Sequence, residues 1–119
     1  MRSIVLVTGG RTYANAALLD SALDHVTAML GGSIAILQGG AKGADRLAKD
    51  WAIRHGCPVL TCDAPWDYYG RGRAGPIRNG WMLEVCPVAY AVAFPGGTGT
   101  ADMVRKIQKA GVTLWDLRA

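Results

Sequence analysis

The sequence predicts an α/β fold: a Rossmann-like three-layer sandwich, with a five-stranded, mostly parallel sheet and helices on both faces. Short apolar runs rich in β-branched residues alternate with segments whose apolar residues recur every three or four positions, as in a sheet covered by helices. Three of the apolar runs end in glycine-rich stretches that each precede a helical segment. A chain of 119 residues has the size of one domain, so we expect a single domain over residues 1–119.

Five apolar runs are expected to form the strands. The first, SIVLVT, is apolar on both faces, which is typical of a buried strand in a parallel sheet. If the first and fourth strands are central neighbours, the strand order reverses between them, and ligands bind beside the carboxyl ends of strands at such a switch point. The expected strands cover residues 3–8, 33–38, 57–62, 87–94 and 112–117.

Helices are expected between these strands. The first covers residues 14–30, the second ends at Gly56, and the last follows the fourth strand and ends at Gly111. Residues 63–80 contain many glycines and a proline and are expected to be irregular, leading into a short helix at residues 79–85.

Composition excludes several classes of protein. No apolar run approaches the roughly 20 residues of a membrane span, so we expect a cytoplasmic protein with no membrane partner. The net charge of +4 and the pI of about 9.2 suit nucleic acid weakly and a small phosphorylated ligand equally well. Cys57, Cys62 and Cys86 lack CxxC spacing and are expected to be buried thiols. His25 and His55 have no partner at ligand spacing, so we expect neither a metal site nor a cofactor.

The three glycine-rich stretches, GGRTY, GGAKGAD and PGGTGT, are the main candidate site. Glycine lets backbone N–H groups approach a ligand, and the N-terminus of the following helix adds unpaired donors and a positive dipole end. Glycines that only make tight turns are the alternative for any one loop, but three loops converging on a switch point favour a phosphate-bearing ligand. The candidate ligand-binding residues in these loops are Gly9, Gly10, Arg11, Thr12, Gly39, Gly40, Lys42, Gly43, Pro95, Gly96, Gly97, Thr98, Gly99 and Thr100.

Several polar and aromatic residues are further candidates for the ligand site. Asp45 falls in the first turn of the second helix, where it either caps backbone N–H groups or contacts a ribose hydroxyl or a water nucleophile. Arg78 and Asn79 are candidates for a second polar wall of the ligand site. Tyr13 either packs against the first helix or lines the pocket. Three more aromatic side chains either stack on a base or cover a sheet edge: Trp66, Tyr68 and Tyr69.

Two standard nucleotide signatures are absent. GGAKGAD does not match GxxxxGK[ST], because Lys42 precedes the glycine and no Ser or Thr follows it. GTGTAD does not match GxGxxG, and Gln38 stands at the end of the second strand where a dehydrogenase has an acidic residue. The sequence therefore disfavours a P-loop NTPase and an NAD-dependent dehydrogenase.

Four stretches, GGRTY, QGGAKGADRLAKDWA, AGPIRNGWML and AFPGGTGTADMVRKIQKAG, together resemble the YspA/cpYpsA-related branch of the SLOG superfamily over nearly the whole chain. The resemblance implies a Rossmann-like fold that binds nucleotides or nucleotide-derived molecules. The superfamily includes the "lonely guy" phosphoribohydrolases, DNA-processing protein A and sensor domains for ADP-ribose-like signals. The resemblance also strengthens the case for Arg78 as a ligand-binding residue, because related hydrolases use an arginine from this part of the fold.

The phosphoribohydrolases carry PGGxGTxxE, whose glutamate takes part in cleaving the N-glycosidic bond. This chain has Met103 at that position, and Asp102, one residue earlier, points about 100° away around a helix. We therefore expect a sensor or sequestering module for a nucleotide or nucleotide-derived ligand. The alternatives are an N-glycosidic hydrolase with Asp45 or Asp102 as catalytic residues and, ranked last, a nucleic-acid-binding protein. The residues do not indicate an oligomeric state, and a homodimer is considered only by analogy with small SLOG-like domains.

Overall fold

The computed structural model describes residues 2–119, apart from the side chains of Trp66, Asp67 and Arg71. All five strands form one sheet with the order β3-β2-β1-β4-β5, and every neighbouring pair is parallel. The expected α/β sheet is confirmed, and it is wholly rather than mostly parallel. The strands are β1 (Ser3–Thr8), β2 (Ile34–Gln38), β3 (Val59–Thr61), β4 (Val88–Ala93) and β5 (Leu114–Asp116).

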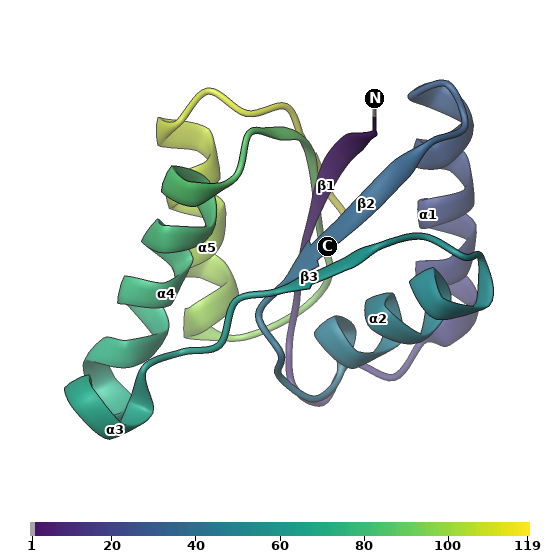
Figure 1. Ribbon diagram of the computed structural model, residues 1–119. Helices are drawn as coiled ribbons and strands as arrows, with labels where there is room; N and C mark the ends of the chain where they lie inside the picture. The colour runs from purple at the N-terminus through teal and green to yellow at the C-terminus, as the bar shows by residue number, and fades with distance from the viewer. Residues whose placement is uncertain (1) are drawn as a thin grey trace.

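Helices cover both faces of the sheet, as Figure 1 shows. α1 (Ala16–Met29) and α2 (Ala44–Arg54) lie on one face, and α4 (Arg71–Val85) and α5 (Thr98–Lys109) lie on the other. The chain crosses between the faces after β3, through the short α3 (Trp66–Tyr69). Because β1 and β4 are hydrogen-bonded neighbours, the strand order reverses between them, and the expected switch point is confirmed.

Each face of the sheet has its own apolar core, and the alternation of side chains along β1 separates them. Val5 and Val7 are buried with residues of α1 and α2, including Trp51. Leu6 is buried on the opposite face with Met103 of α5 and other residues of α4 and α5. The two cores pack helices against both faces of the β1–β4 pair, so the loops that follow these two strands extend from a well-packed part of the sheet.

The expectation that residues 63–80 are irregular is wrong, because most of this segment belongs to α3 and α4. Glycine and proline are poor helix formers, and Pro76 lies inside α4, where it lacks an N–H for the helical ladder. Tertiary contacts stabilise the helix despite this. Ala74 and Met82 are buried, and Lys106 Nζ donates a hydrogen bond to the Pro76 carbonyl at 2.6 Å. Packing against α5 therefore outweighs the local preference.

The three cysteines are partly rather than fully buried and form no disulfide, which corrects the expectation of buried thiols. Cys57 and Cys62 flank β3, an edge strand that has a neighbour on one side only, and Cys86 follows the end of α4. Among the residues that the structure describes, no helix is long and apolar enough to cross a bilayer, and no group of three His, Cys, Asp or Glu side chains is placed to hold a metal ion.

Candidate functional site

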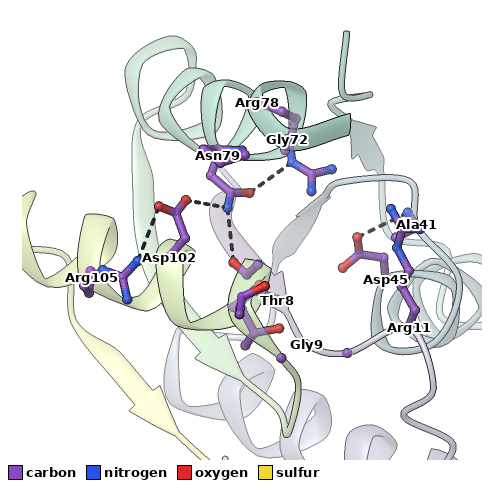
Figure 2. A pocket seen from close by; sticks show the side chains of 17 residues that line it. Thr8, Gly9, Arg11, Ala41, Asp45, Gly72, Arg78, Asn79, Asp102 and Arg105 are labelled. Atoms are coloured by element: carbon purple, nitrogen blue, oxygen red, sulfur yellow. Dashed lines mark hydrogen bonds and ion pairs between the residues drawn. The ribbon is translucent and has the colours of Figure 1, made fainter. Parts of the chain in front are cut away.

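A cavity of about 610 Å³ lies beyond the carboxyl ends of β1 and β4, and we call it the main cavity. The loop after β1, the first turn of α5, one side of α4 and the start of α2 form its walls, as Figure 2 shows. It therefore occupies the switch point at which the sequence placed the ligand. Its lining residues are Thr8, Gly9, Gly10, Arg11, Ala41, Asp45, Gly72, Gly75, Pro76, Arg78, Asn79, Gly97, Thr98, Gly99, Thr100, Asp102 and Arg105.

Several of the conspicuous glycines are needed for packing between loops. Gly10 donates its backbone N–H to the Pro95 carbonyl at 2.9 Å and accepts a hydrogen bond from the Ala44 N–H at 3.2 Å. A Cβ on Gly10 would lie 2.9 Å from Gly96 Cα. Gly43 has a φ of +75°, and a Cβ there would lie 2.2 Å from the Gly10 carbonyl oxygen. For these residues, glycine is required by the close approach of three loops to one another.

Gly97 and Gly99 differ from those glycines. Both line the main cavity, and a Cβ added to either would meet no atom within 4 Å. Gly97 is the N-cap of α5 and offers no side chain to the first-turn amides, so this helix begins without a side-chain cap. Thr98 and Thr100 lie in the same first turn and also line the cavity. The start of α5 thus presents backbone donors and the positive end of a helix dipole to an open space.

In the loop between β2 and α2, a side chain of the protein itself accepts hydrogen bonds from backbone N–H groups. Asp45 Oδ2 accepts hydrogen bonds from the backbone N–H groups of Gly39 at 3.2 Å and Ala41 at 3.3 Å. Asp45 is 6% exposed, and its burial raises the pKa of the carboxyl group, although these amides and the guanidinium groups of Arg78 and Arg11 act in the opposite direction. The structural role considered for Asp45 is therefore present, and the same carboxyl group also lines the main cavity.

Arg78 and Asn79, the candidates for a second polar wall, lie side by side on α4 and both line the main cavity. Arg78 Nη1 donates to the Gly39 carbonyl at 2.7 Å, and Arg78 Nε donates to Asn79 Oδ1 at 3.0 Å. Asn79, which is 4% exposed, donates from Nδ2 to the Gly99 carbonyl at 3.2 Å and to Asp102 Oδ2 at 3.0 Å. This chain of hydrogen bonds fixes the Arg78 guanidinium between the β2 loop and the start of α5 (Figure 2).

Asp102 faces the cavity, whereas Met103 is 1% exposed and belongs to the core beneath α5. Lys106 Nζ lies 2.8 Å from Asp102 Oδ2, and Arg105 Nη2 lies 3.7 Å from Asp102 Oδ1. Partial burial acts to raise the pKa of Asp102, but the hydrogen bonds from Lys106 and Asn79 outweigh it and hold that pKa below its ordinary value. Sequence reasoning missed Arg105 and Lys106, although their spacing of three and four residues from Asp102 on a helix was a usable signal.

Other predicted residues line two smaller cavities that adjoin the main one. The Tyr13 cavity, of about 500 Å³, is lined by Thr12, Tyr13 and Pro95 among others. The Lys42 cavity, of about 470 Å³, includes Gly40 and Lys42. Tyr13 both packs against the Phe94 ring, with 5.2 Å between ring centroids, and lines its cavity. Its hydroxyl group is buried and has no hydrogen-bond partner among the residues described.

Two of the aromatic residues considered for base stacking, Tyr68 and Tyr69, are absent from the lining of these three cavities. Tyr68 is 83% exposed and contacts the Tyr69 ring edge-on, with 4.7 Å between ring centroids. The side chain of Trp66 lies outside the part of the chain that the structure describes. The prediction of base stacking by Tyr68 or Tyr69 therefore has no support in the geometry.

Comparison with known proteins assigns the family. The model of the YspA, cpYpsA-related SLOG family, YAcAr, matches residues 3–69. This chain belongs to the YAcAr family. The match contains the loops after β1 and β2, whereas Arg78 and the PGGTGT loop lie beyond it.

One similar sequence and one similar structure accompany this match. The YAcAr chain is 33% identical over 119 residues to the Gene 61 protein of Mycobacterium phage D29, with 91% of this chain and 90% of that protein covered. It is also similar to the X-ray structure of DNA processing protein A (DprA) from Streptococcus pneumoniae, with a TM-score of 0.78 and 15% sequence identity. That alignment covers 97% of this chain and 50% of the DprA chain, so the YAcAr chain spans half the length of that structure. At this identity the likeness shows the shared fold alone.

Proposed function

We propose that this YAcAr domain binds a nucleotide or nucleotide-derived ligand, such as a nucleoside phosphate or an ADP-ribose-like molecule, and acts as a sensor or sequestering module. The observation that carries the proposal is the uncapped start of α5, where Gly97 and Gly99 face the main cavity without a neighbouring atom that a side chain would meet. A phosphate group accepts hydrogen bonds from several backbone N–H groups at once and is stabilised by the helix dipole.

Charged side chains complement this cradle. Arg11, Arg78 and Arg105 line the same cavity as the start of α5. One guanidinium group can donate two parallel hydrogen bonds to two oxygens of a phosphate. The Arg78 side chain is already oriented by its hydrogen bonds to Gly39 and Asn79. A preorganised arginine loses less entropy on binding than a mobile one, which favours affinity.

The ligand's phosphate and sugar are expected to supply most of the contacts. The described residues that line the main cavity include no aromatic side chain, so none of them offers a base a surface for stacking. The Asp45 carboxyl group lines the side formed by the β2 loop, where it favours a hydroxyl donor over a second phosphate. We therefore expect the phosphate at α5 and the sugar hydroxyls toward Asp45.

Binding is favoured over hydrolysis. Asp102 is held ionised by Lys106 and Asn79, which makes it a poor proton donor and a weak base. Position 103, where the related hydrolases carry their glutamate, is filled by a methionine that packs in the core. The carboxyl groups that line the cavity thus serve its internal hydrogen bonds.

Isothermal titration tests the proposal. Protein freed of copurified ligand by unfolding and refolding is titrated with nucleoside monophosphates, ribose 5-phosphate, ADP-ribose and its cyclic isomers, and a single-stranded oligonucleotide. Saturable binding of one or more small phosphates, weakened at least tenfold in Arg78→Gln, supports the proposal. Refolded protein that binds none of them refutes it, and steeply salt-dependent binding of the oligonucleotide alone favours a nucleic-acid partner instead.

One observation favours N-glycosidic hydrolysis as a second candidate function. Asp45 is buried beside the main cavity with a raised pKa, which suits a general acid or base. Chromatography of nucleoside monophosphates incubated with the protein detects a released base. Base release that disappears in Asp45→Asn supports this candidate, and release unchanged in Asp45→Asn and in Asp102→Asn excludes both carboxyl groups from the reaction.

A further inference from the structure

The Lys42 cavity points to a feature of the ligand that the main cavity alone does not require. We infer that the ligand carries a second phosphoryl group, on the far side of its sugar from the first, and that this group occupies the Lys42 cavity. The inference rests on the proposed function, because it assumes that the first phosphoryl group lies at the start of α5.

The two cavities are contiguous. Both are lined by Arg11, Ala41 and Arg78, so the two arginines stand at the boundary between them. The Arg78 side chain is fixed there by hydrogen bonds from Nη1 to the Gly39 carbonyl and from Nε to Asn79. Its second terminal nitrogen, Nη2, forms no hydrogen bond with the side chains and backbone that the structure describes, so its N–H groups can donate to a ligand. A molecule that extends from one cavity to the other passes these guanidinium groups.

The Lys42 cavity has the more cationic lining of the two. Its charged residues are Arg11, Lys42 and Arg78, opposed by Asp63 as the one carboxylate among the described lining residues. The main cavity also has three arginines, but Asp45 and Asp102 oppose them there. Since each cavity has three cationic residues, the Lys42 cavity has the larger excess of positive charge.

Lys42 is positioned for a ligand rather than for the protein itself. Its side chain is exposed, and within the described part of the chain it forms no ion pair and no hydrogen bond. Asp63 Oδ1 lies close to Gly40, in the same loop as Lys42, where an added Cβ would stand 2.5 Å from it, yet Asp63 forms no ion pair with Lys42. The Lys42 ammonium group therefore has no ion-pair partner among the described residues that line its cavity.

The chemistry of this cavity suits a terminal phosphoryl group. The backbone N–H groups of Gly39 and Ala41 donate to Asp45 and that of Gly40 donates to Gln38, so the side-chain cations are the main donors that this lining offers. A lysine ammonium acts as a compact point charge, and an arginine adds directed N–H donors, a combination that favours an anion with several exposed oxygens. A sugar with phosphoryl groups at both ends matches the two cavities.

Matched nucleotides test the inference. AMP, ADP, adenosine 3′,5′-bisphosphate and adenosine 2′,5′-bisphosphate are titrated into the refolded protein at one salt concentration. One of the bisphosphates is expected to bind at least about tenfold more tightly than AMP, or about 1.4 kcal/mol. ADP is expected to gain less, because its additional phosphoryl group lies on the same end of the sugar as the first.

Charge variants locate the second group. Lys42→Gln is expected to reduce the affinity ratio of bisphosphate to AMP toward one, and Asp63→Asn is expected to increase it by about threefold. Lys49→Gln is the matched control, because Lys49 is exposed on α2 and lines none of the three cavities. It makes the same change in net charge and should leave the ratio unaltered.

The outcomes separate the two proposals. If AMP binds and neither bisphosphate binds more tightly, or if the bisphosphate ratio is unchanged in Lys42→Gln, the inference is wrong while the proposed function stands. An equal effect of Lys42→Gln and Lys49→Gln also overturns it, because it indicates a general effect of charge. If no phosphate of any kind binds, the proposed function fails and the inference fails with it.

Discussion

Replacing Gly99 by alanine should separate the stability of the fold from the binding of ligand. Gly99 lies in the first turn of α5 and lines the main cavity. A Cβ at this position meets no atom within 4 Å, so the methyl group causes no clash in the free protein. The same methyl group stands beside the backbone donors at which we place the phosphate. We therefore expect a variant that folds at least as well as the parent and binds phosphate ligands poorly.

The magnitudes follow from the helix and from the lost contacts. Alanine in place of a helical glycine stabilises a protein by about 0.5–1 kcal/mol, which is roughly 2–6 °C in Tm for a domain of this size. A hydrogen bond to a charged group contributes about 1.5–3 kcal/mol, so losing one weakens binding about 10- to 100-fold. Thermal unfolding measures the first effect, and isothermal titration with AMP measures the second.

Gly80→Ala is the matched control. Gly80 lies in α4, its added Cβ also meets no atom within 4 Å, and it lines none of the three cavities. It should give a similar rise in Tm with unchanged affinity. If Gly99→Ala bound AMP as tightly as the parent does, the start of α5 would not be the phosphate site, and the reasoning from the open glycines would be refuted.

Three further predictions concern the acidic residues and the core. Asp45→Ala should lower the free energy of unfolding by about 2–4 kcal/mol in urea denaturation, since two loop amides lose their acceptor, and Asp45→Asn should cost less because its oxygen still accepts. The pKa of Asp102 is lowered in the folded protein, so its carboxylate stabilises the fold above the ordinary pKa, and this stabilisation is lost as the pH falls through the folded-state pKa. When the free energy of unfolding is measured from pH 6 to pH 3, it should therefore fall less in Asp102→Asn than in the parent. Asp45, whose pKa is raised, has the opposite sign, and Asp45→Asn should steepen that loss. Met103→Glu should reduce stability by roughly 3 kcal/mol or more and create no base release, because it places a carboxyl group in the core; a stable variant that cleaves nucleotides would contradict this.

The strands were predictable because they depend on a local and regular signal, whereas the switch point also required the assumption that the first and fourth strands are neighbours. Each strand is a short apolar run followed by glycine, proline or polar residues, and the structure places all five within the expected ranges. α4 was not predictable in this way, because its glycines and Pro76 indicate a loop. The burial of Ala74 and Met82 against the rest of the fold stabilises the helix, and a sequence pattern does not display contacts between distant segments.

The sequence located the candidate site but not the separate roles of its glycines. Gly43 and Gly97 look alike in sequence, yet one is required by a carbonyl oxygen 2.2 Å from its would-be Cβ and the other borders open space. The PGGxGTxxE pattern likewise directed attention to position 103, whereas the structure turns Asp102 toward the cavity and Met103 into the core. The role of each of these residues depends on which other segment of the chain lies next to it, and only the folded structure shows this.

Mapping of backbone amide shifts by NMR tests the central claim most directly. Isotope-labelled protein, freed of copurified ligand, is titrated with AMP, and the changes in amide chemical shift are followed residue by residue. We expect saturable changes that are largest at residues 98–100 and 8–11, around the main cavity. Saturable changes confined to other surfaces, or no changes at millimolar AMP and at millimolar ADP-ribose, would contradict this claim.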